Sequence, residues 1–192
     1  SNVTSMRYMF KECGSAEKNT GFTLNLGNKF DTSKVKNMSR MFNYCGWYST
    51  VFTLDLGDKF DTSNVTSMDY MFEYCGYKSE VFKLDLGSKF DTSKVKAMPR
   101  MFADCGSASE DFTLNLGNKF KTENVTDMKY MFYECGKSSK NFTELDLSGF
   151  TISFFEVNGL ANFAGYIPVT SFIFGDGWAD AVLPEPGSFD AV

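Results

Sequence analysis

Apolar and polar residues alternate in a short segment that returns every thirty residues along the chain. In one copy Phe52, Leu54 and Leu56 are separated by polar residues, and Gly57 follows them. Alternation with a period of two is typical of a β-strand with one buried face. The pattern therefore predicts one short strand in each repeat, and equivalent strands of successive repeats should run parallel.

A second apolar pattern follows each strand. It steps by three, three, one and three residues in Val65, Met68, Met71, Phe72 and Cys75. Such a stripe is typical of a helix, and Gly76 stands where a left-handed cap ends one. Proline is tolerated only in the first turn of a helix, so Pro99 places the start of the equivalent helix near residue 98. We expect a helix of about two turns in each repeat.

Five similar repeats account for most of the chain. A phenylalanine recurs at an unbroken spacing of thirty, at Phe30, Phe60, Phe90, Phe120 and Phe150. We assign five repeats to residues 1–149, the first without its opening residues. Residues 150–178 are expected to form a degenerate sixth repeat that acts as a C-terminal cap, and residues 179–192 a tail or linker.

One repeat does not bury its own apolar residues, so the repeats must stack. Stacking covers these side chains and gives each strand neighbours for its backbone hydrogen bonds. The sequence therefore predicts an α/β solenoid with one short parallel strand and one short helix per repeat of about thirty residues.

The repeat resembles the BspA-like class of leucine-rich repeats, which occurs in bacterial surface proteins and some protists. The resemblance covers residues 1–149 and, weakly, 150–178. Lys121 and Glu123 depart from it, since they replace the Asp and Ser of the other repeats. The residues that carry it in one repeat are Leu54, Asp55, Leu56, Phe60, Asp61, Thr62, Ser63, Asn64, Val65, Thr66, Met68, Met71, Phe72 and Cys75.

This resemblance implies a right-handed coil like that of leucine-rich repeats, at the cell surface or outside the cell. It also implies adhesion to host proteins or to neighbouring cells. It supplies no catalytic residues.

Composition narrows the classes of partner. The chain has a formal net charge of −5 and no histidine. A net negative charge argues against a nucleic-acid partner held through phosphate contacts. No apolar run approaches the roughly 18 residues that a membrane span requires, so we expect no membrane insertion of this segment.

Each of the five repeats carries one cysteine: Cys13, Cys45, Cys75, Cys105 and Cys135. Metal sites usually need clustered ligands, whereas these thiols are about thirty residues apart and no histidine accompanies them. We expect a column of buried free thiols that behave as small apolar side chains. Disulfides between neighbouring coils are the alternative.

The outward strand positions form a polar face that is a candidate binding surface. It includes Thr53 and Asp55 in one repeat and Lys83 and Asp85 in the next. Parallel strands lie ~4.8 Å apart, so the two aspartates should repel each other unless a cation or Lys83 offsets their charge. Calcium binding is one hypothesis. The preferred prediction is a solvated face without metal.

The loops after each Cys-Gly pair vary most between repeats. Two of them carry Trp47, Tyr48 and Tyr77. Aromatic residues are enriched at binding hot spots, so we treat these three as candidate ligand contacts. The alternative is that they pack over the edge of the coil.

These patterns favour a protein without catalysis or cofactor. A repeat that copies each polar residue does not easily build one active site, and no nucleophile motif or phosphate loop is present. We expect a surface or secreted repeat protein that recognises a protein or glycan. The alternative is a structural solenoid that self-assembles into fibres or a surface layer.

Overall fold

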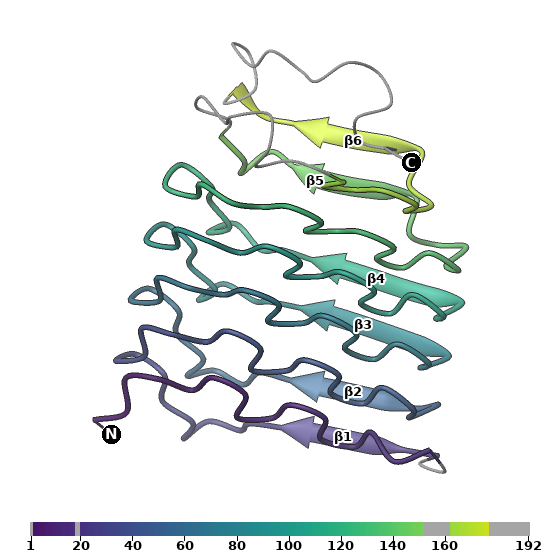
Figure 1. Ribbon diagram of the computed structural model, residues 1–192, viewed down its shortest axis with the longest axis horizontal. Helices are drawn as coiled ribbons and strands as arrows, with labels where there is room; N and C mark the ends of the chain where they lie inside the picture. Colours follow the sequence, from purple (N-terminus) through teal and green to yellow (C-terminus); the bar gives the residue numbers. More distant parts are fainter. Residues whose placement is uncertain (1, 18–19, 152–161, 177–192) are drawn as a thin grey trace.

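The computed structural model describes residues 2–17, 20–151 and 162–176, and these form a parallel β-solenoid of about five turns (Figure 1). One strand lies in each coil, with a sixth strand in the partly described last coil, and all strands point the same way (Figure 1). The prediction of one short parallel strand per repeat is confirmed. The strands are β1 (Phe22–Asn25), β2 (Phe52–Asp55), β3 (Val81–Asp85), β4 (Asp111–Asn115), β5 (Glu144–Leu147) and β6 (Ser171–Phe174).

The alternation along the strands places one face inside the coil. In β2, Phe52 and Leu54 are buried, whereas Thr53 and Asp55 are exposed. The same pattern runs through β3. The outward strand positions are therefore a solvent-facing surface, as the period of two predicts.

The strands associate in pairs rather than in one continuous ladder. Parallel ladders join β1 with β2, β3 with β4, and β5 with β6. Within the first pair, the Phe22 N–H donates to the Val51 carbonyl at 2.9 Å. At the boundary that follows, the Phe52 N–H donates instead to the Ser79 hydroxyl at 3.1 Å. Ser139 accepts from Phe112 in the same way at the β4–β5 boundary.

The helix expected in each repeat is absent, and this prediction is wrong. Within the described residues the chain contains no α-helix. In the third coil an isolated bridge at Ser67 is followed by a run of turns over residues 69–78, and the equivalent segments of the other coils are similar. Each run enters the left-handed region twice. In the second coil this occurs at Arg40, with φ of 60°, and at Tyr44, with φ of 57°. A helix cannot continue through such residues.

Hydrogen bonds between coils explain why turns replace the helix. Every second N–H of the run points to the neighbouring coil. For example, the Phe42 N–H donates to the Met71 carbonyl at 2.9 Å. The N–H groups between them close short turns, as when Cys45 donates to the Phe42 carbonyl at 3.0 Å. Stacking therefore satisfies backbone groups that an isolated segment would have to satisfy by forming a helix.

Pro99 fits this arrangement without marking a helix start. The equivalent N–H, that of Ser39, donates only to the side chain of Asn37 within its own coil. A proline here therefore removes no bond between coils. Its carbonyl still accepts from the Tyr70 N–H at 2.9 Å.

Columns of phenylalanine fill the interior. Phe42, Phe72, Phe102 and Phe132 are fully buried, and successive rings are stacked with centroids 5.3 to 5.6 Å apart. This geometry lies within the preferred range for aromatic pairs. The residues expected on a helical stripe are thus buried, although the backbone that carries them is not helical.

The C-terminal part is described only to residue 176. Strand β6 pairs with β5, and Phe172 and Phe174 lie opposite Leu145 and Leu147. The predicted tail of residues 179–192 and a large part of the predicted cap lie outside the described residues. The division into repeats, cap and tail therefore stays a prediction. Nowhere in the described ranges is there a helix with the length and apolar character needed to span a bilayer.

Candidate functional site

Five aromatic side chains of two neighbouring coils meet at the loop end of the turn runs. Tyr44 and Tyr74 stack with ring centroids 4.6 Å apart, and Trp47 lies edge-on to Tyr44 at 4.8 Å. Tyr48 and Tyr77 extend the group by contacts with Trp47 and Tyr74 at 4.7 and 5.6 Å. All five rings are half-buried. We call these five residues the aromatic cluster.

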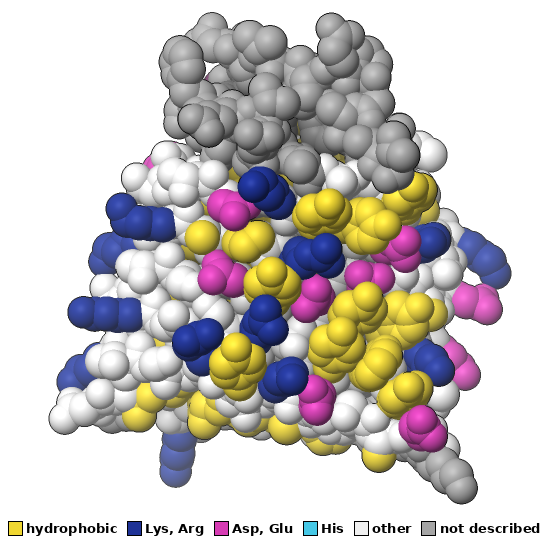
Figure 2. Space-filling model, in the orientation of Figure 1, with side chains coloured by type: hydrophobic (Ala, Val, Ile, Leu, Met, Phe, Trp, Pro, Cys, Tyr) yellow, Lys and Arg dark blue, Asp and Glu magenta, His cyan; other side chains and the backbone are white. Residues whose placement is uncertain are grey.

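The structure thus brings together Trp47, Tyr48 and Tyr77, the three loop residues selected from the sequence. Sequence reasoning missed Tyr44 and Tyr74. Their spacing of thirty is visible in the sequence, but neither tyrosine lies on the apolar stripe from which the helix is predicted. Figure 2 shows hydrophobic side chains gathered mainly on the right of this face, with charged side chains between them.

Two details of the cluster concern polar groups. The Trp47 Nε1 is buried and has no hydrogen-bond partner. A buried donor without a partner lowers stability. Lys78 lies over the Tyr48 ring, with its Nζ 4.5 Å from the centroid. The aromatic cluster therefore contains an unsatisfied donor, and the cation of Lys78 lies beside it.

Arginine and tyrosine alternate along an adjacent row of the turn runs. The guanidinium of Arg40 lies 4.2 Å from the centroid of Tyr70, and that of Arg100 lies 4.5 Å from Tyr130. Tyr8 begins the row, 5.9 Å from Arg40. Cation–π contacts of this kind hold the planar guanidinium groups in place.

Two carboxylates are buried beside this row. Burial raises the pKa of Glu73, although Arg100 lies 3.6 Å away and Asn43 donates to it at 2.9 Å. Burial, followed by the charge of Glu134, raises the pKa of Asp104 to about 6. The protonation of Asp104 therefore responds to mildly acidic pH.

The four strand-face candidates lie on separate strand pairs. Thr53 and Asp55 belong to β2, while Lys83 and Asp85 belong to β3, and all four are exposed. Asn25 donates to Asp55 at 2.9 Å. Asp55 and Asp85 each accept a backbone N–H two residues ahead at 2.9 Å. Across the described part of the chain, no group of three or more Cys, Asp or Glu residues is arranged to hold a metal ion.

All five cysteines are free. Cys45, Cys75, Cys105 and Cys135 are fully buried, and Cys13 is half-buried. Burial raises the pKa of the Cys45, Cys75 and Cys135 thiols. These thiols are held in the uncharged form, which is poorly nucleophilic.

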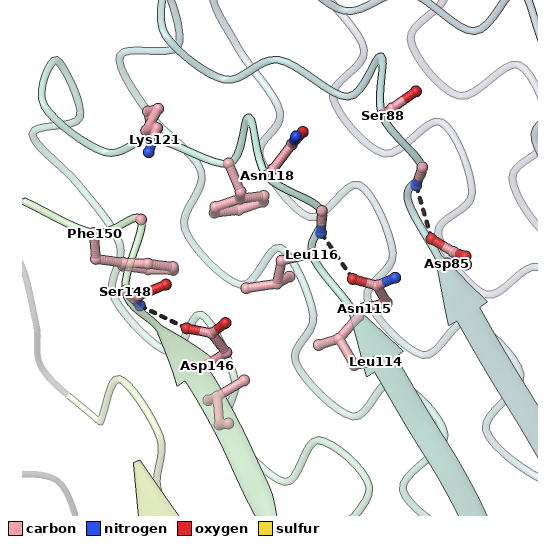
Figure 3. A pocket seen from close by; sticks show the side chains of 15 residues that line it. Asp85, Ser88, Leu114, Asn115, Leu116, Asn118, Lys121, Asp146, Ser148 and Phe150 are labelled. Carbon is pink, nitrogen blue, oxygen red and sulfur yellow. Dashed lines mark hydrogen bonds between the residues drawn. The ribbon is translucent and has the colours of Figure 1, made fainter. Parts of the chain in front are cut away.

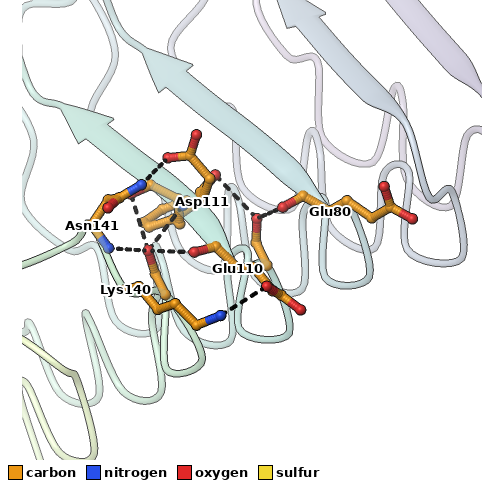
Figure 4. A network of polar contacts seen from close by, with 8 residues as sticks. Glu80, Glu110, Asp111, Lys140 and Asn141 are labelled. Carbon is orange, nitrogen blue, oxygen red and sulfur yellow. Dashed lines mark hydrogen bonds and ion pairs between the residues drawn. The ribbon is translucent and has the colours of Figure 1, made fainter.

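A polar network lies where the loops enter β4 and β5 (Figure 4). Lys140 pairs with Glu110 at 3.0 Å, and Asn141 donates to Asp111 at the same distance. Both contacts join side chains thirty residues apart. Glu110, Lys140 and Asn141 are exposed and Asp111 is half-buried, so these contacts contribute little to stability. The network serves to align neighbouring coils.

A family model described as "Mycoplasma protein of unknown function, DUF285" matches residues 1–80 and 49–166. The two matches together span most of the solenoid. The comparisons with curated proteins and with solved structures gave no match.

Proposed function

The chain belongs to the DUF285 family, and we propose that its solenoid is a non-enzymatic recognition module that binds a protein or glycan partner through the aromatic cluster. The module acts at the cell surface or outside the cell, in adhesion to a host protein or a neighbouring cell. It requires no cofactor.

One observation carries this proposal: residues of two coils join into a single half-exposed aromatic surface. Trp, Tyr and Arg are the residue types most enriched at protein-binding hot spots. The cluster contains Trp47 and four tyrosines, and Arg40 and Arg100 lie in the adjacent row. This composition favours a protein partner over a glycan.

The repeat supports the absence of catalysis. The chain has no histidine, and most polar positions recur from coil to coil. The resemblance to BspA-like repeats supports an extracellular or surface location and adhesion. The same resemblance is the basis for proposing a leucine-rich-repeat relationship.

A binding experiment with matched variants tests the proposal. The probes are a panel of purified extracellular-matrix proteins and an array of defined glycans. The test variant carries Trp47→Ser, Tyr48→Ser and Tyr77→Ser, and the control carries Thr53→Ser and Lys83→Gln on the strand face. We expect at least a tenfold loss of affinity in the test variant only, equivalent to ~1.4 kcal/mol.

Three results would contradict the proposal. Binding that survives the triple substitution, with both variants folded by thermal melting, would remove the aromatic cluster from the interface. Loss in the control alone would assign binding to the strand face. Concentration-dependent growth of assemblies in sedimentation velocity, without binding to any probe, would favour the structural alternative.

A further inference from the structure

A pocket of about 650 Å³ lies at the ends of β3, β4 and β5 (Figure 3). The pocket forms where the spacing between the phenylalanine and the leucines of the strand changes from one repeat to the next. Leu114 and Leu116 stand two and four residues after Phe112, but Leu145 and Leu147 stand three and five residues after Phe142. The fifth strand is therefore shifted by one residue relative to the fourth.

The shift shortens the following turn. Three residues, 117–119, connect Leu116 to Phe120, whereas only two, Ser148 and Gly149, connect Leu147 to Phe150. Strands β4 and β5 also belong to different ladders. The unequal turns and the interrupted ladder leave the space that the pocket occupies.

The floor of the pocket is apolar. It is formed by Leu114, Leu116, Phe120, Leu145 and Phe150. Leu114 is half-buried, whereas its equivalents Leu54 and Leu84 are 7% and 1% exposed. The pocket thus uncovers an inward-facing position that is sealed in the second and third coils.

The rim of the pocket is polar. Asp85, Asn115 and Asp146 each accept a backbone N–H through Oδ1, at 2.9, 3.0 and 2.8 Å, and this bond fixes their orientation (Figure 3). The second polar atom of each side chain is left for an incoming group. Lys121, which replaces the aspartate of the earlier repeats, also lines the pocket. Two departures from the repeat, Lys121 and the shifted fifth strand, therefore meet at one place.

We propose that this pocket binds a neutral pyranose unit of a glycan. A sugar ring presents a C–H face that suits the apolar floor and hydroxyl groups that suit the fixed acceptors and donors of the rim. Two aspartates against one lysine disfavour an anionic sugar. The apolar floor and Lys121 disfavour a metal ion or a polyamine.

This site is separate from the aromatic cluster, which belongs to the second and third coils. Sugar binding in the pocket does not depend on the proposed function of the aromatic cluster. Either proposal can be wrong while the other is right. A variant that removes the aromatic cluster should leave sugar binding unchanged.

Nuclear magnetic resonance of the whole chain tests the proposal. The probes are methyl glycosides of glucose, galactose, mannose and N-acetylglucosamine, together with glucuronic acid and putrescine. We expect at least one neutral glycoside to shift the amide signals of Gly117 and Ser148, with a dissociation constant on the order of 1 mM.

Two matched substitutions locate the binding. Asn118→Trp fills the mouth of the pocket and should abolish the shifts. Asp58→Trp makes the same change at the equivalent turn of the second coil, outside the pocket, and should preserve them. Thermal melting of both variants verifies that they fold.

A third variant tests the ligand class. Asp146→Asn keeps the oxygen that accepts from Ser148 but removes the charge, so neutral sugars should still bind within about threefold. The proposal is overturned if no neutral glycoside binds, if Asn118→Trp leaves binding intact, or if putrescine or glucuronic acid binds more tightly than every neutral sugar.

Discussion

Asp104 shows how a single side chain makes the stability of the solenoid depend on pH. It is 6% exposed, and burial and the nearby Glu134 raise its pKa from 3.8 to about 6. Between these values the folded state binds more protons than the unfolded state. The free energy of unfolding therefore falls as pH rises from about 4 to about 6, and above pH 6 the full cost of the charge is present.

Replacing Asp104 with Asn should remove this cost. We expect Asp104→Asn to raise the free energy of unfolding by about 1–3 kcal/mol at pH 7.5 and to have little effect near pH 4. Urea unfolding at both pH values measures the difference. Glu110→Gln, at an exposed position, is the control and should show no such trend. An equal effect of Asp104→Asn at both pH values would contradict the assignment.

The thiols give a second prediction at the level of residues. Cys13 is half-buried, whereas the other four cysteines are fully buried. Exposure and thiolate character control thiol reactivity. We expect one thiol to react quickly with an aromatic disulfide reagent at pH 8, and four to react only as fast as the chain unfolds. Fewer than five reactive thiols in denaturant would instead indicate disulfides.

At the level of elements, a run of turns and a helix would give opposite orders of stability for Gly and Ala variants at the same position. Glu12 has φ of 60°, and its side chain is paired only with the exposed Lys11. Gly adopts this conformation without strain, so Glu12→Gly should be about 1 kcal/mol more stable than Glu12→Ala. In a helix Ala would be favoured by about the same amount. Chemical denaturation of the two variants measures the order.

The neighbouring residue provides the control. Lys11 is not among the residues with positive φ. At this position Ala should be more stable than Gly. The same order at positions 11 and 12 would show that the run of turns is not maintained in solution.

The run of turns also shows why the sequence predicts the strand correctly but predicts a helix for the segment that follows each opening phenylalanine. A strand has a period of two that no other element shares. The spacing of Met68, Met71, Phe72 and Cys75 suits a helix, but a run of four-residue turns buries the same positions. Only the hydrogen bonds between coils distinguish the two, and these depend on contacts thirty residues apart.

The candidate sites were predictable to different degrees for the same reason. Trp47, Tyr48 and Tyr77 were found because they are aromatic residues in the loops that vary most between repeats. The pocket was not found, because the one-residue shift near Glu144 acts only when the fifth coil stacks on the fourth. Departures from a repeat are thus visible in the sequence, but the cavities that they open can be recognised only in the stacked structure.

At the scale of the whole molecule, substitutions at two glycines can test whether the coils associate in pairs. Gly87 and Gly117 have nearly equal φ, 71° and 74°. A Cβ at Gly117 would meet the Gly87 carbonyl oxygen across the β3–β4 pair. A Cβ at Gly87 would meet nothing within 4 Å, because β2 and β3 belong to different ladders.

Both substitutions with Ala place a side chain at positive φ, at a cost of about 1–2 kcal/mol each. Gly117→Ala must also push two coils apart, and we expect a further loss of about 1–3 kcal/mol in the free energy of unfolding. Urea denaturation of the two variants measures the difference. Since their backbone conformations match, that difference reports only on how closely neighbouring coils approach. Equal losses would mean that all coils stack at one spacing, and the solenoid would then be a uniform array rather than a series of strand pairs.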